Sequence, residues 1–270
     1  MKIPKGLELY FDPVTAKLLA ERQENYRHRE VAEIIATIIL DKLKDTPDPI
    51  SVAALGAGAH ADRYNSLFDR LLRQSEGHMD WVDFSPYMLA MAPDYLQKKG
   101  LENREKVISY IEQYSLQYLE QKAENSLDAV IMQYTLEDIQ ELELLFKLLA
   151  KAVKEGGIMV ATIQASPEIT SVHSNWRYLY QGKEFQENET RTLKDGEEWQ
   201  LKCYKEVDNP AAGFIPGVET VKYFHSSETI AKLANKYGFD CFIGDWREPL
   251  PGELQNKFEI DQSVLILKKK

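Results

Sequence analysis

The sequence predicts an α/β fold with a doubly wound, mostly parallel seven-stranded sheet and an antiparallel last strand. Strand-like and helix-like patterns alternate from residue 50 to about residue 163, as in the βαβ units of a parallel sheet. Residues 1–49 read as a helical extension, and residues 164–224 interrupt the alternation as a β-rich insertion before the last helix. We therefore expect an N-terminal helical cap, residues 1–49, and a main domain, residues 50–270, that contains the insertion.

Length and composition fit a chain that buries one large core. The 270 residues are 44% apolar, and a compact chain of this size hides roughly 75% of the surface that its unfolded form exposes. The longest apolar runs, residues 34–40 and 144–150, are far shorter than the roughly 20 residues that cross a bilayer. We therefore expect no association with a membrane.

The net charge and the cysteine content indicate which binding partners and which cellular compartment to expect. The chain has 33 Lys and Arg against 43 Asp and Glu, a net charge of −10, which argues against DNA or RNA as a partner. Cys203 and Cys241 belong to no CxxC motif and no Cys/His cluster, so a reducing, cytoplasmic location is expected. The five histidines form neither HxxxH nor HExxH, so no metal is expected.

The N-terminal extension contains two helical patterns. Asp12 and Pro13 supply an N-cap and a proline at the first helical position. Apolar residues then repeat at helical spacing, at Val31, Ile34, Ile35, Ile38, Ile39 and Leu43. The proline-containing segment 45–49 ends the second pattern. Two helices are therefore expected before the first strand.

Two strand–turn–helix units follow. Residues 50–55 are a continuous apolar run, typical of a strand that is buried on both faces. The glycine turn 56–58 then leads into a helix. The second strand, residues 79–84, runs into Ser85 and Pro86, which can cap and open the next helix.

The remaining units complete the sheet. Three more strands are predicted at residues 107–111, 128–133 and 158–163, with a helix at 139–153 that ends at a pair of glycines. After the insertion, residues 226–237 form the last helix. Strands at residues 239–244 and 263–267 have no helix between them, so they should pair antiparallel.

The insertion contains one local turn signal. Asp195-Gly196 precedes a segment in which Trp199, Leu201 and Cys203 alternate with polar residues. An Asp-Gly pair before such an alternation predicts a β-hairpin.

The glycine turn and the end of the second strand form the candidate ligand site. In an open α/β sheet, ligands bind beyond the carboxyl ends of the strands, where a glycine turn lets the backbone approach the ligand. Asp83 ends the neighbouring strand, where its carboxylate can accept both hydroxyls of a ribose, so a nucleoside-type ligand is expected. Gly56, Gly58 and Ala61 with Asp83 also satisfy the dinucleotide fingerprint. These residues alone therefore leave the kind of nucleoside open.

Several segments in order resemble the class I S-adenosylmethionine-dependent methyltransferases, a Rossmann-like superfamily. VAALGAGAHAD is similar to their glycine motif, and WVDFSPYML to their second-strand motif. LDAVIMQYTLEDI resembles the fourth-strand motif, and LLAKAVKEGGIMVATI the helix and strand that follow it. The closing strand pair, preceded by YFHSSETIAKLANKYGF, resembles the family's last unit. The resemblance runs from about residue 50 to the C-terminus and implies methyl transfer from S-adenosylmethionine.

The resemblance also implies a set of cofactor-binding residues. In chain order they are Gly56, Ala57, Gly58, His60, Asp83, Phe84, Met88, Tyr114, Ser115 and Gln133. By position, Gly56 and Gly58 face the methionine part of the cofactor and Asp83 faces the ribose. Phe84 and Met88 face the adenine.

The chain departs from the family's pattern in three places. Ala54 stands where the family usually has an acid, and His60 stands where it has a third glycine. Tyr114 or Ser115 replaces an acidic residue near the adenine amino group. His60 can instead donate to the cofactor's carboxylate or face solvent. These departures leave a degenerate, non-catalytic site open.

The methyl acceptor is expected beside the sulfonium. Methyl transfer from a sulfonium is an in-line displacement, so the protein mainly holds the acceptor close and aligned, and it needs a base only when the nucleophile carries a proton. The sequence therefore assigns no catalytic residue. Candidates for contact with the acceptor are Tyr26, His28, Tyr134, Glu137, His173, Trp176 and Tyr178. Their aromatic character favours an organic acceptor over a bare ion.

The sequence thus predicts an S-adenosylmethionine-dependent methyltransferase that acts on a small organic molecule. One alternative is an NAD(P)-binding Rossmann oxidoreductase, which the dinucleotide fingerprint allows. Three features argue against an oxidoreductase. They are the helical extension, residues 1–49, before the glycine turn, the lack of a residue pair placed to act where hydride would be transferred, and the antiparallel strand pair at the end of the sheet. The other alternative is a non-catalytic binding protein with the methyltransferase fold, which Ala54 and His60 favour. The acceptor, the methylated atom and the oligomeric state are not predicted.

Overall fold

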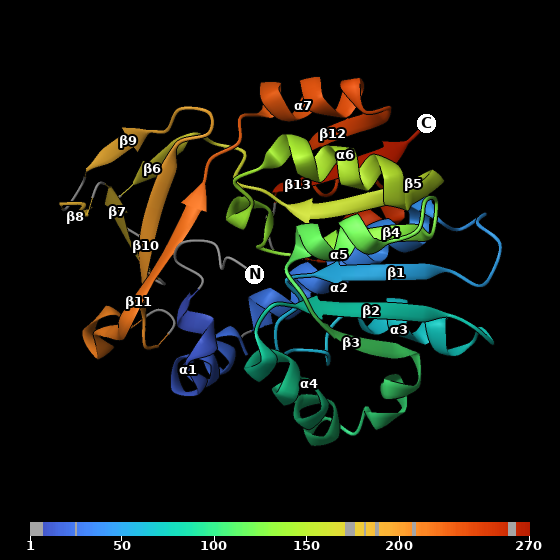
Figure 1. The fold of residues 1–270 in the computed structure, drawn as a ribbon, viewed down its shortest axis with the longest axis horizontal. Coiled ribbons are helices and arrows are strands. Elements are labelled where there is room, and N and C mark those ends of the chain that lie inside the picture. The colour runs from blue at the N-terminus through green and yellow to red at the C-terminus, as the bar shows by residue number, and fades with distance from the viewer. Residues whose placement is uncertain are drawn as a thin grey trace.

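A seven-stranded sheet forms the centre of the molecule. The computed structural model describes residues 8–24, 26–170, 176–180, 182–186, 189–206, 209–258 and 263–270. In spatial order the strands are β12 (Phe239–Asp245), β13 (Ser263–Lys269), β5 (Val153–Thr162), β4 (Leu127–Met132), β1 (Ser51–Leu55), β2 (His78–Asp83) and β3 (Ile108–Glu112) (Figure 1). Strands β1 to β5 pair in parallel, whereas β13 is antiparallel to both β5 and β12. The predicted fold class is confirmed.

Helices cover both faces of this sheet. One core cluster joins the sheet to α2 (Tyr26–Lys42), α3 (Asn65–Leu72) and α4 (Pro86–Lys98). A second cluster joins the opposite face to α5 (Ser115–Gln121), α6 (Leu142–Ala152) and α7 (Ser227–Lys236). The remaining short helices are η1 (Glu8–Phe11), η2 (Glu102–Val107), η3 (Leu136–Asp138), η4 (Pro210–Ala212) and α8 (Gly252–Gln255). Among the described residues, no helix has the length and apolarity to cross a bilayer.

The predicted helix starts have the expected caps. The Asp12 carboxylate accepts the N–H of Thr15 at 2.7 Å, where α1 (Pro13–Gln23) begins. The Ser85 hydroxyl accepts the N–H of Met88 at 3.2 Å at the start of α4. Each side chain satisfies a backbone donor that has no partner within its helix.

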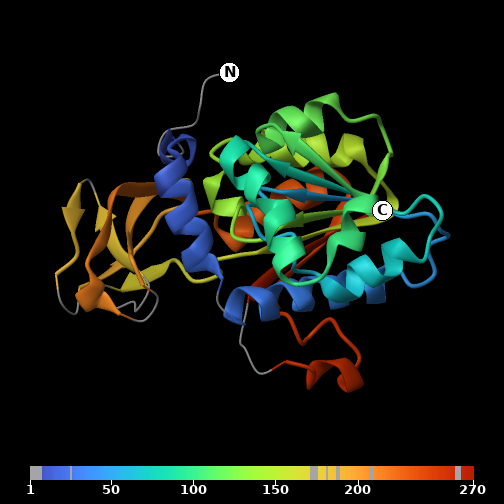
Figure 2. The same ribbon diagram turned by 90° about the horizontal axis from the view of Figure 1, so that it is seen from below.

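The insertion builds two small sheets beside the main one. The larger has the order β11 (Phe214–Tyr223), β10 (Glu198–Tyr204), β7 (Trp176–Tyr180) and β8 (Lys183–Glu184), and the smaller pairs β6 (Glu168–Thr170) with β9 (Thr190–Thr192). Apolar residues of β10, including Trp199 and Leu201, share a third cluster with Leu19 of α1. Helix α1 therefore lies between the insertion and the main sheet (Figure 2). The insertion is β-rich, as predicted.

The two N-terminal helices pack against different parts of the protein. Helix α2 buries Ile34, Ile35 and Ile38 completely against the main sheet. Helix α1 packs between the insertion and α4 instead. The division into a cap, residues 1–49, and a main domain, residues 50–270, stays a prediction.

The predicted hairpin at Asp195-Gly196 is wrong. The strands on either side of this turn belong to different sheets, because β9 pairs with β6 and β10 pairs with β7 and β11. The Asp195 carboxylate accepts the N–H of Ser226 at 2.6 Å and the hydroxyl of Thr229 at 2.8 Å. The turn is therefore tied to the start of α7. The alternation along β10 is confirmed, since Trp199, Leu201 and Cys203 are buried.

Candidate active site

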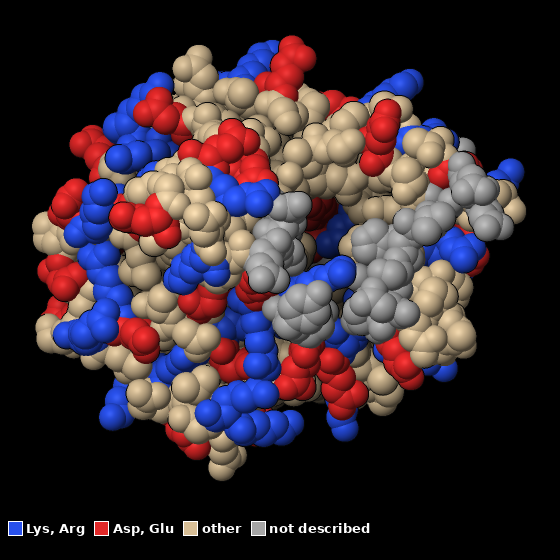
Figure 3. All heavy atoms as spheres, turned by 180° about the vertical axis from the view of Figure 1, so that it is seen from behind, with Lys and Arg blue, Asp and Glu red and all other residues tan. Residues whose placement is uncertain are grey.

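A cavity of about 840 Å³ lies between the carboxyl ends of the parallel strands and the insertion. Its lining comes from the ends of β1, β2, β4 and β5, from α1 and α2, and from β10 and β11. On the face shown in Figure 3 the surface is hollowed, and both basic and acidic side chains are visible in the hollow. The cavity therefore lies where an open α/β sheet is expected to bind a ligand.

The glycine turn after β1 forms part of the cavity wall. Gly56 and Gly58 have φ angles of +62° and +66°, a region that side chains with a Cβ rarely adopt. A Cβ on Gly56 would lie 2.3 Å from Cγ2 of Thr135. At Gly58 the nearest atom to a Cβ would be Oε1 of Gln23 at 3.8 Å. The lack of a Cβ at Gly56 thus lets the side chain of Thr135 pack closely, whereas a Cβ at Gly58 would have room.

Asp83 links the glycine turn to the start of α4. Its Oδ2 accepts the N–H of Gly58 at 2.8 Å, and its Oδ1 accepts the N–H of Ser85 at 2.9 Å. The side chain lines the cavity although the residue is only 6% exposed. Burial raises the pKa of Asp83 to about 6, against the lowering effect of the two backbone donors. A carboxylate oxygen has two lone pairs, so both oxygens can accept a further hydrogen bond.

The expected adenine end is also assembled. Phe84, Met88, Tyr114 and Ser115 all line the cavity. The ring of Phe84 lies 5.5 Å from the ring of Tyr10, measured between centroids. Apolar and aromatic side chains therefore line the same cavity as Asp83, which ends β2.

Gln133 connects the end of β4 with α2 and with the residue that precedes α3. Its Oε1 accepts the hydroxyl of Tyr64 at 2.7 Å, and its Nε2 donates to the carbonyl oxygen of His28 at 2.9 Å. Gln133 thus lines the cavity in an orientation that these two hydrogen bonds fix.

His60 does not line the cavity, unlike the other residues implied by the resemblance. Its ring is 1% exposed, and its Nε2 lies 2.8 Å from the carbonyl oxygen of Ala20. The ring also packs against Tyr95, at 4.2 Å between centroids. The solvent-facing alternative for His60 is therefore wrong, since the side chain is buried and joins the turn to α1.

The expected acceptor residues divide into three groups. His28, Tyr134, Glu137 and Trp176 line the cavity, and the rings of His28 and Tyr134 lie 4.8 Å apart. Tyr178 does not line it. That side chain packs against Phe185 and Trp199 in the insertion. His173 and the side chain of Tyr26 lie outside the described part of the structure.

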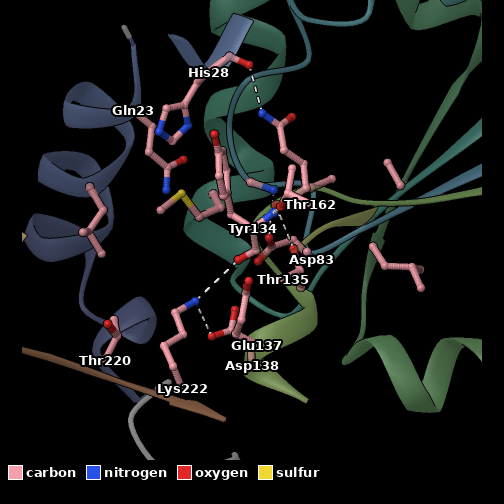
Figure 4. A pocket seen from close by; sticks show the side chains of 18 of the residues that line it. Gln23, His28, Asp83, Tyr134, Thr135, Glu137, Asp138, Thr162, Thr220 and Lys222 are labelled. Atoms are coloured by element: carbon pink, nitrogen blue, oxygen red, sulfur yellow. Dashed lines mark hydrogen bonds and ion pairs between the residues drawn. The ribbon is translucent and has the colours of Figure 1, made fainter. Parts of the chain in front are cut away.

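A charged cluster at the insertion side was not predicted from the sequence. Lys222 of β11 donates to Asp138 at 2.6 Å and to the carbonyl oxygen of Tyr134 at 3.4 Å (Figure 4). The side chains of Lys222 and Asp138 are 16% and 17% exposed. Burial raises the pKa values of both Glu137 and Asp138, and Lys222 opposes both increases. The sequence offered no signal for Lys222, which is separated from Asp138 by 84 residues.

Arg63 is a second residue that sequence reasoning missed. It lines the cavity near the glycine turn and is 7% exposed. One guanidinium nitrogen donates to the carbonyl oxygen of Gln23 at 2.7 Å, but the Nε has no hydrogen-bond partner within the described ranges. Burial lowers the pKa of Arg63 to about 10, so it remains a cation at neutral pH. A buried cation of this kind favours a bound anion.

Solved structures with this fold were compared with the chain. A S-adenosylmethionine-dependent methyltransferase from Clostridium acetobutylicum has a TM-score of 0.53 and 12% identity, with 94% of this chain and 98% of that chain covered. A 1,6-didemethyltoxoflavin-N1-methyltransferase from Burkholderia thailandensis has a TM-score of 0.51 and 11% identity, over 100% and 92% of the two chains. At these identities the likeness shows the fold alone.

One family model matches the central part of the chain. Residues 56–161 match the model described as a methyltransferase domain. Residues 56–161 therefore form a methyltransferase domain, and the chain has the fold of solved S-adenosylmethionine-dependent methyltransferases. The matched segment contains the glycine turn, Asp83 and the end of β4, which border the cavity. The family resemblance predicted from the sequence is thereby confirmed.

Two further comparisons bear on the function of the chain. The search of curated proteins found no match. The [4+2]-cyclase SpnF has the same fold, with a TM-score of 0.55, 12% identity, and 98% and 95% of the two chains covered. A protein with this fold can therefore carry another chemistry, so the reaction has to be argued from the site.

Proposed function

We propose that this methyltransferase transfers a methyl group from S-adenosylmethionine to a small organic acceptor in the cavity above β1, β2 and β4. One observation carries the proposal most directly: the Asp83 carboxylate faces this cavity while it also holds the glycine turn. All the residues implied by the resemblance except His60 line the same cavity. The glycine turn and the strand-end carboxylate thus form one site.

The cavity residues fit the parts of the cofactor. Asp83 has lone pairs left for the two ribose hydroxyls. Phe84 and Met88 offer apolar surface to the adenine, flanked by Tyr114 and Ser115. The turn residues 56–58 face the methionine part, with Ala57 between the two glycines. The orphaned Nε of the buried Arg63 supports an anion, such as the methionine carboxylate, at this end.

The bound cofactor supplies an electrophilic methyl group on a sulfonium. The protein then has to hold the acceptor in line and keep water out. Tyr134, His28 and Trp176 present rings to the cavity, and Glu137 presents a carboxylate. We propose these four as acceptor contacts. Tyr178 lies behind the cavity wall, and Tyr26 and His173 stay predictions.

The alternatives from the sequence have less support. The family model describes a methyltransferase domain, not an oxidoreductase. Ala54 is buried in β1 at the cavity, so the missing acid leaves an apolar wall. The cavity remains large despite this departure. A binding protein without catalysis would keep the cavity but release no demethylated cofactor.

The experiment is mass spectrometry of small molecules released from the purified protein. We expect S-adenosylhomocysteine or S-adenosylmethionine in the released fraction. The Asp83→Ala variant, purified in parallel, should release less. Release of NAD(H) with no adenosyl sulfur compound would refute the proposal.

We also propose a cytoplasmic location and no nucleic-acid partner. Cys203 is buried and Cys241 is exposed, and both are free thiols. Free thiols fit a reducing compartment. The net charge of −10 opposes binding to phosphate backbones.

A further inference from the structure

The inner face of the insertion sheet forms one wall of the cavity. Strand β10 contributes Trp199, Leu201 and Cys203, and β11 contributes Thr220 and Lys222. The antiparallel register pairs Trp199 with Lys222 and Leu201 with Thr220. These side chains therefore belong to one face of the sheet, because side chains alternate along a strand.

Carboxylates stand opposite this wall. Glu137 and Asp138 lie in η3, directly after β4, and Asp83 ends β2. Lys222 is the cation that pairs with Asp138, whereas Glu137 forms no ion pair within the described ranges. Figure 4 shows the three carboxylates in one region of the cavity, with Lys222 reaching toward them from β11. Asp138 is thus neutralised by Lys222, and Glu137 is the η3 carboxylate left without an ion pair in the described part of the chain, in a cavity whose lining also includes Arg22, Arg27 and Arg63.

Thr220 gives a second, independent sign of a ligand. Its hydroxyl oxygen is buried and has no hydrogen-bond partner in the described structure, and the residue is 4% exposed. The side chain rises from β11 beside Lys222, toward the cavity (Figure 4). A buried hydroxyl without a partner costs stability. Such a group is retained at low cost when a ligand completes its hydrogen bond.

We propose that the wall formed by β10 and β11, together with Glu137, binds a methyl acceptor that carries an amine. This inference rests on the proposed function, since it names the acceptor class of the same site. The ammonium form of the amine offsets the charge of Glu137, and a hydroxyl or carbonyl group of the acceptor bonds to Thr220. An acidic acceptor would instead place a second negative charge beside Glu137.

The same arrangement supplies a base that removes a proton from the ammonium group before methyl transfer. Glu137 accepts a proton from the ammonium group, which frees the lone pair of the nitrogen. The nitrogen–carbon bond then forms as the sulfur–carbon bond breaks, and the electron pair of the broken bond stays on sulfur. The raised pKa of Glu137, caused by burial, brings its basicity closer to that of the amine.

The test uses matched probes and measures binding. Benzylamine, benzyl alcohol and benzoate share one ring and differ in the head group. Each is titrated by calorimetry into the purified protein saturated with S-adenosylhomocysteine. We expect benzylamine to bind more tightly than benzyl alcohol, and benzoate to bind most weakly.

Variants assign the effect to the carboxylate. Glu137→Gln should weaken benzylamine binding at least about tenfold, as expected for loss of a charge-assisted hydrogen bond. Glu155→Gln removes the same charge at an exposed position of β5 and should leave the affinity unchanged. Glu137→Asp keeps the charge, and its affinity should lie between those of the wild type and Glu137→Gln. Thr220→Val should leave the melting temperature without ligand unchanged or higher, because the hydroxyl has no partner to lose.

The outcomes separate this inference from the proposed function. If S-adenosylhomocysteine binds but benzylamine binds no better than benzoate, the amine assignment is overturned and the proposed function stands. Equal benzylamine affinity in the wild type and Glu137→Gln would likewise overturn it. If S-adenosylhomocysteine itself does not bind, the proposed function fails first. A lowered melting temperature for Thr220→Val would show that its hydroxyl serves the fold.

Discussion

The carboxylate of Asp83 accepts the backbone N–H of Gly58 at 2.8 Å, so the end of β2 holds the turn that follows β1. The same carboxylate accepts the N–H of Ser85, at the N-cap of α4. Two segments of the proposed cofactor site are thereby fixed by one side chain. A change at Asp83 should for this reason affect both ligand affinity and the stability of the free protein.

Asp83→Ala tests this double role. The variant loses the expected ribose acceptor, and charge-assisted hydrogen bonds contribute roughly 1.5 to 3 kcal/mol each, so S-adenosylhomocysteine should bind at least about tenfold more weakly. The melting temperature without ligand should also fall, because two backbone donors lose their acceptor. Calorimetry and thermal unfolding measure the two effects. Asp94→Ala, an exposed position on α4, is the control and should change neither. A lowered melting temperature with unchanged affinity would exclude Asp83 from the cofactor site.

The pKa of about 6 at Asp83 predicts opposite pH trends for stability and binding. The folded pKa lies above the ordinary value of 3.8, so the folded state holds the proton more tightly. The contribution of Asp83 to stability is therefore greatest at low pH and falls as the pH rises toward 6. Affinity for S-adenosylhomocysteine should rise over the same range, since the ionised carboxylate is the better acceptor.

Calorimetry at a series of pH values checks this trend, with Asp83→Asn as the comparison. Glu137 and Asp138 also have raised pKa values, so the comparison is needed to isolate Asp83. His28 does not interfere, because burial lowers its pKa to about 3 and leaves it neutral here. The pH dependence should be smaller in Asp83→Asn. An unchanged dependence would assign it to the other carboxyl groups.

Gly56→Ala should destabilise the protein strongly. The new Cβ would lie 2.3 Å from Cγ2 of Thr135, at a φ of +62°. Thr135→Ala removes that methyl group, so the double variant should recover part of the lost melting temperature, while the strain from the positive φ remains. Gly100→Ala has nothing within 4 Å and a similar φ of +68°, so it measures the backbone strain alone. Equal losses for Gly56→Ala and Gly100→Ala would contradict the steric explanation.

Lys222→Met should destabilise the free protein by about 3 kcal/mol, because it leaves the largely buried carboxylate of Asp138 without its cation. The double variant with Asp138→Asn should recover part of this loss. Chemical denaturation measures the free energies of unfolding. Lys236→Met is the matched control, since Lys236 pairs with Glu143 on the exposed surface, and it should change stability little. A loss in Lys222→Met no larger than in the control would show that this pair does not tie β11 to η3.

The sequence predicted the main sheet because its signals are local. The apolar runs at β1 and β4, the glycine turn and the caps at Asp12 and Ser85 each act within a few residues. The position of Asp83 followed from topology, since neighbouring parallel strands end at one edge of the sheet. Helix α5 was not predicted, because its seven residues are too few for a clear helical period.

The acceptor side of the cavity depends on contacts between distant segments. The pair of Lys222 and Asp138 joins residues far apart in the chain, and no local pattern marks it. The hairpin prediction failed for the same kind of reason, because Asp195 binds the start of α7 and the strands beside the turn find other partners. His60 was placed by motif position, yet its packing on Ala20 and Tyr95 comes from α1 and α4. Such tertiary contacts override local signals.

The central claim is that the cavity beside Asp83 binds S-adenosylmethionine. Titration calorimetry of the purified protein with S-adenosylhomocysteine and, in parallel, with NADH tests it most directly. We predict saturable binding of S-adenosylhomocysteine with one molecule per chain, at least about tenfold weaker binding in Asp83→Ala, and no binding of NADH. Tight binding of NADH with no response to S-adenosylhomocysteine would contradict the claim.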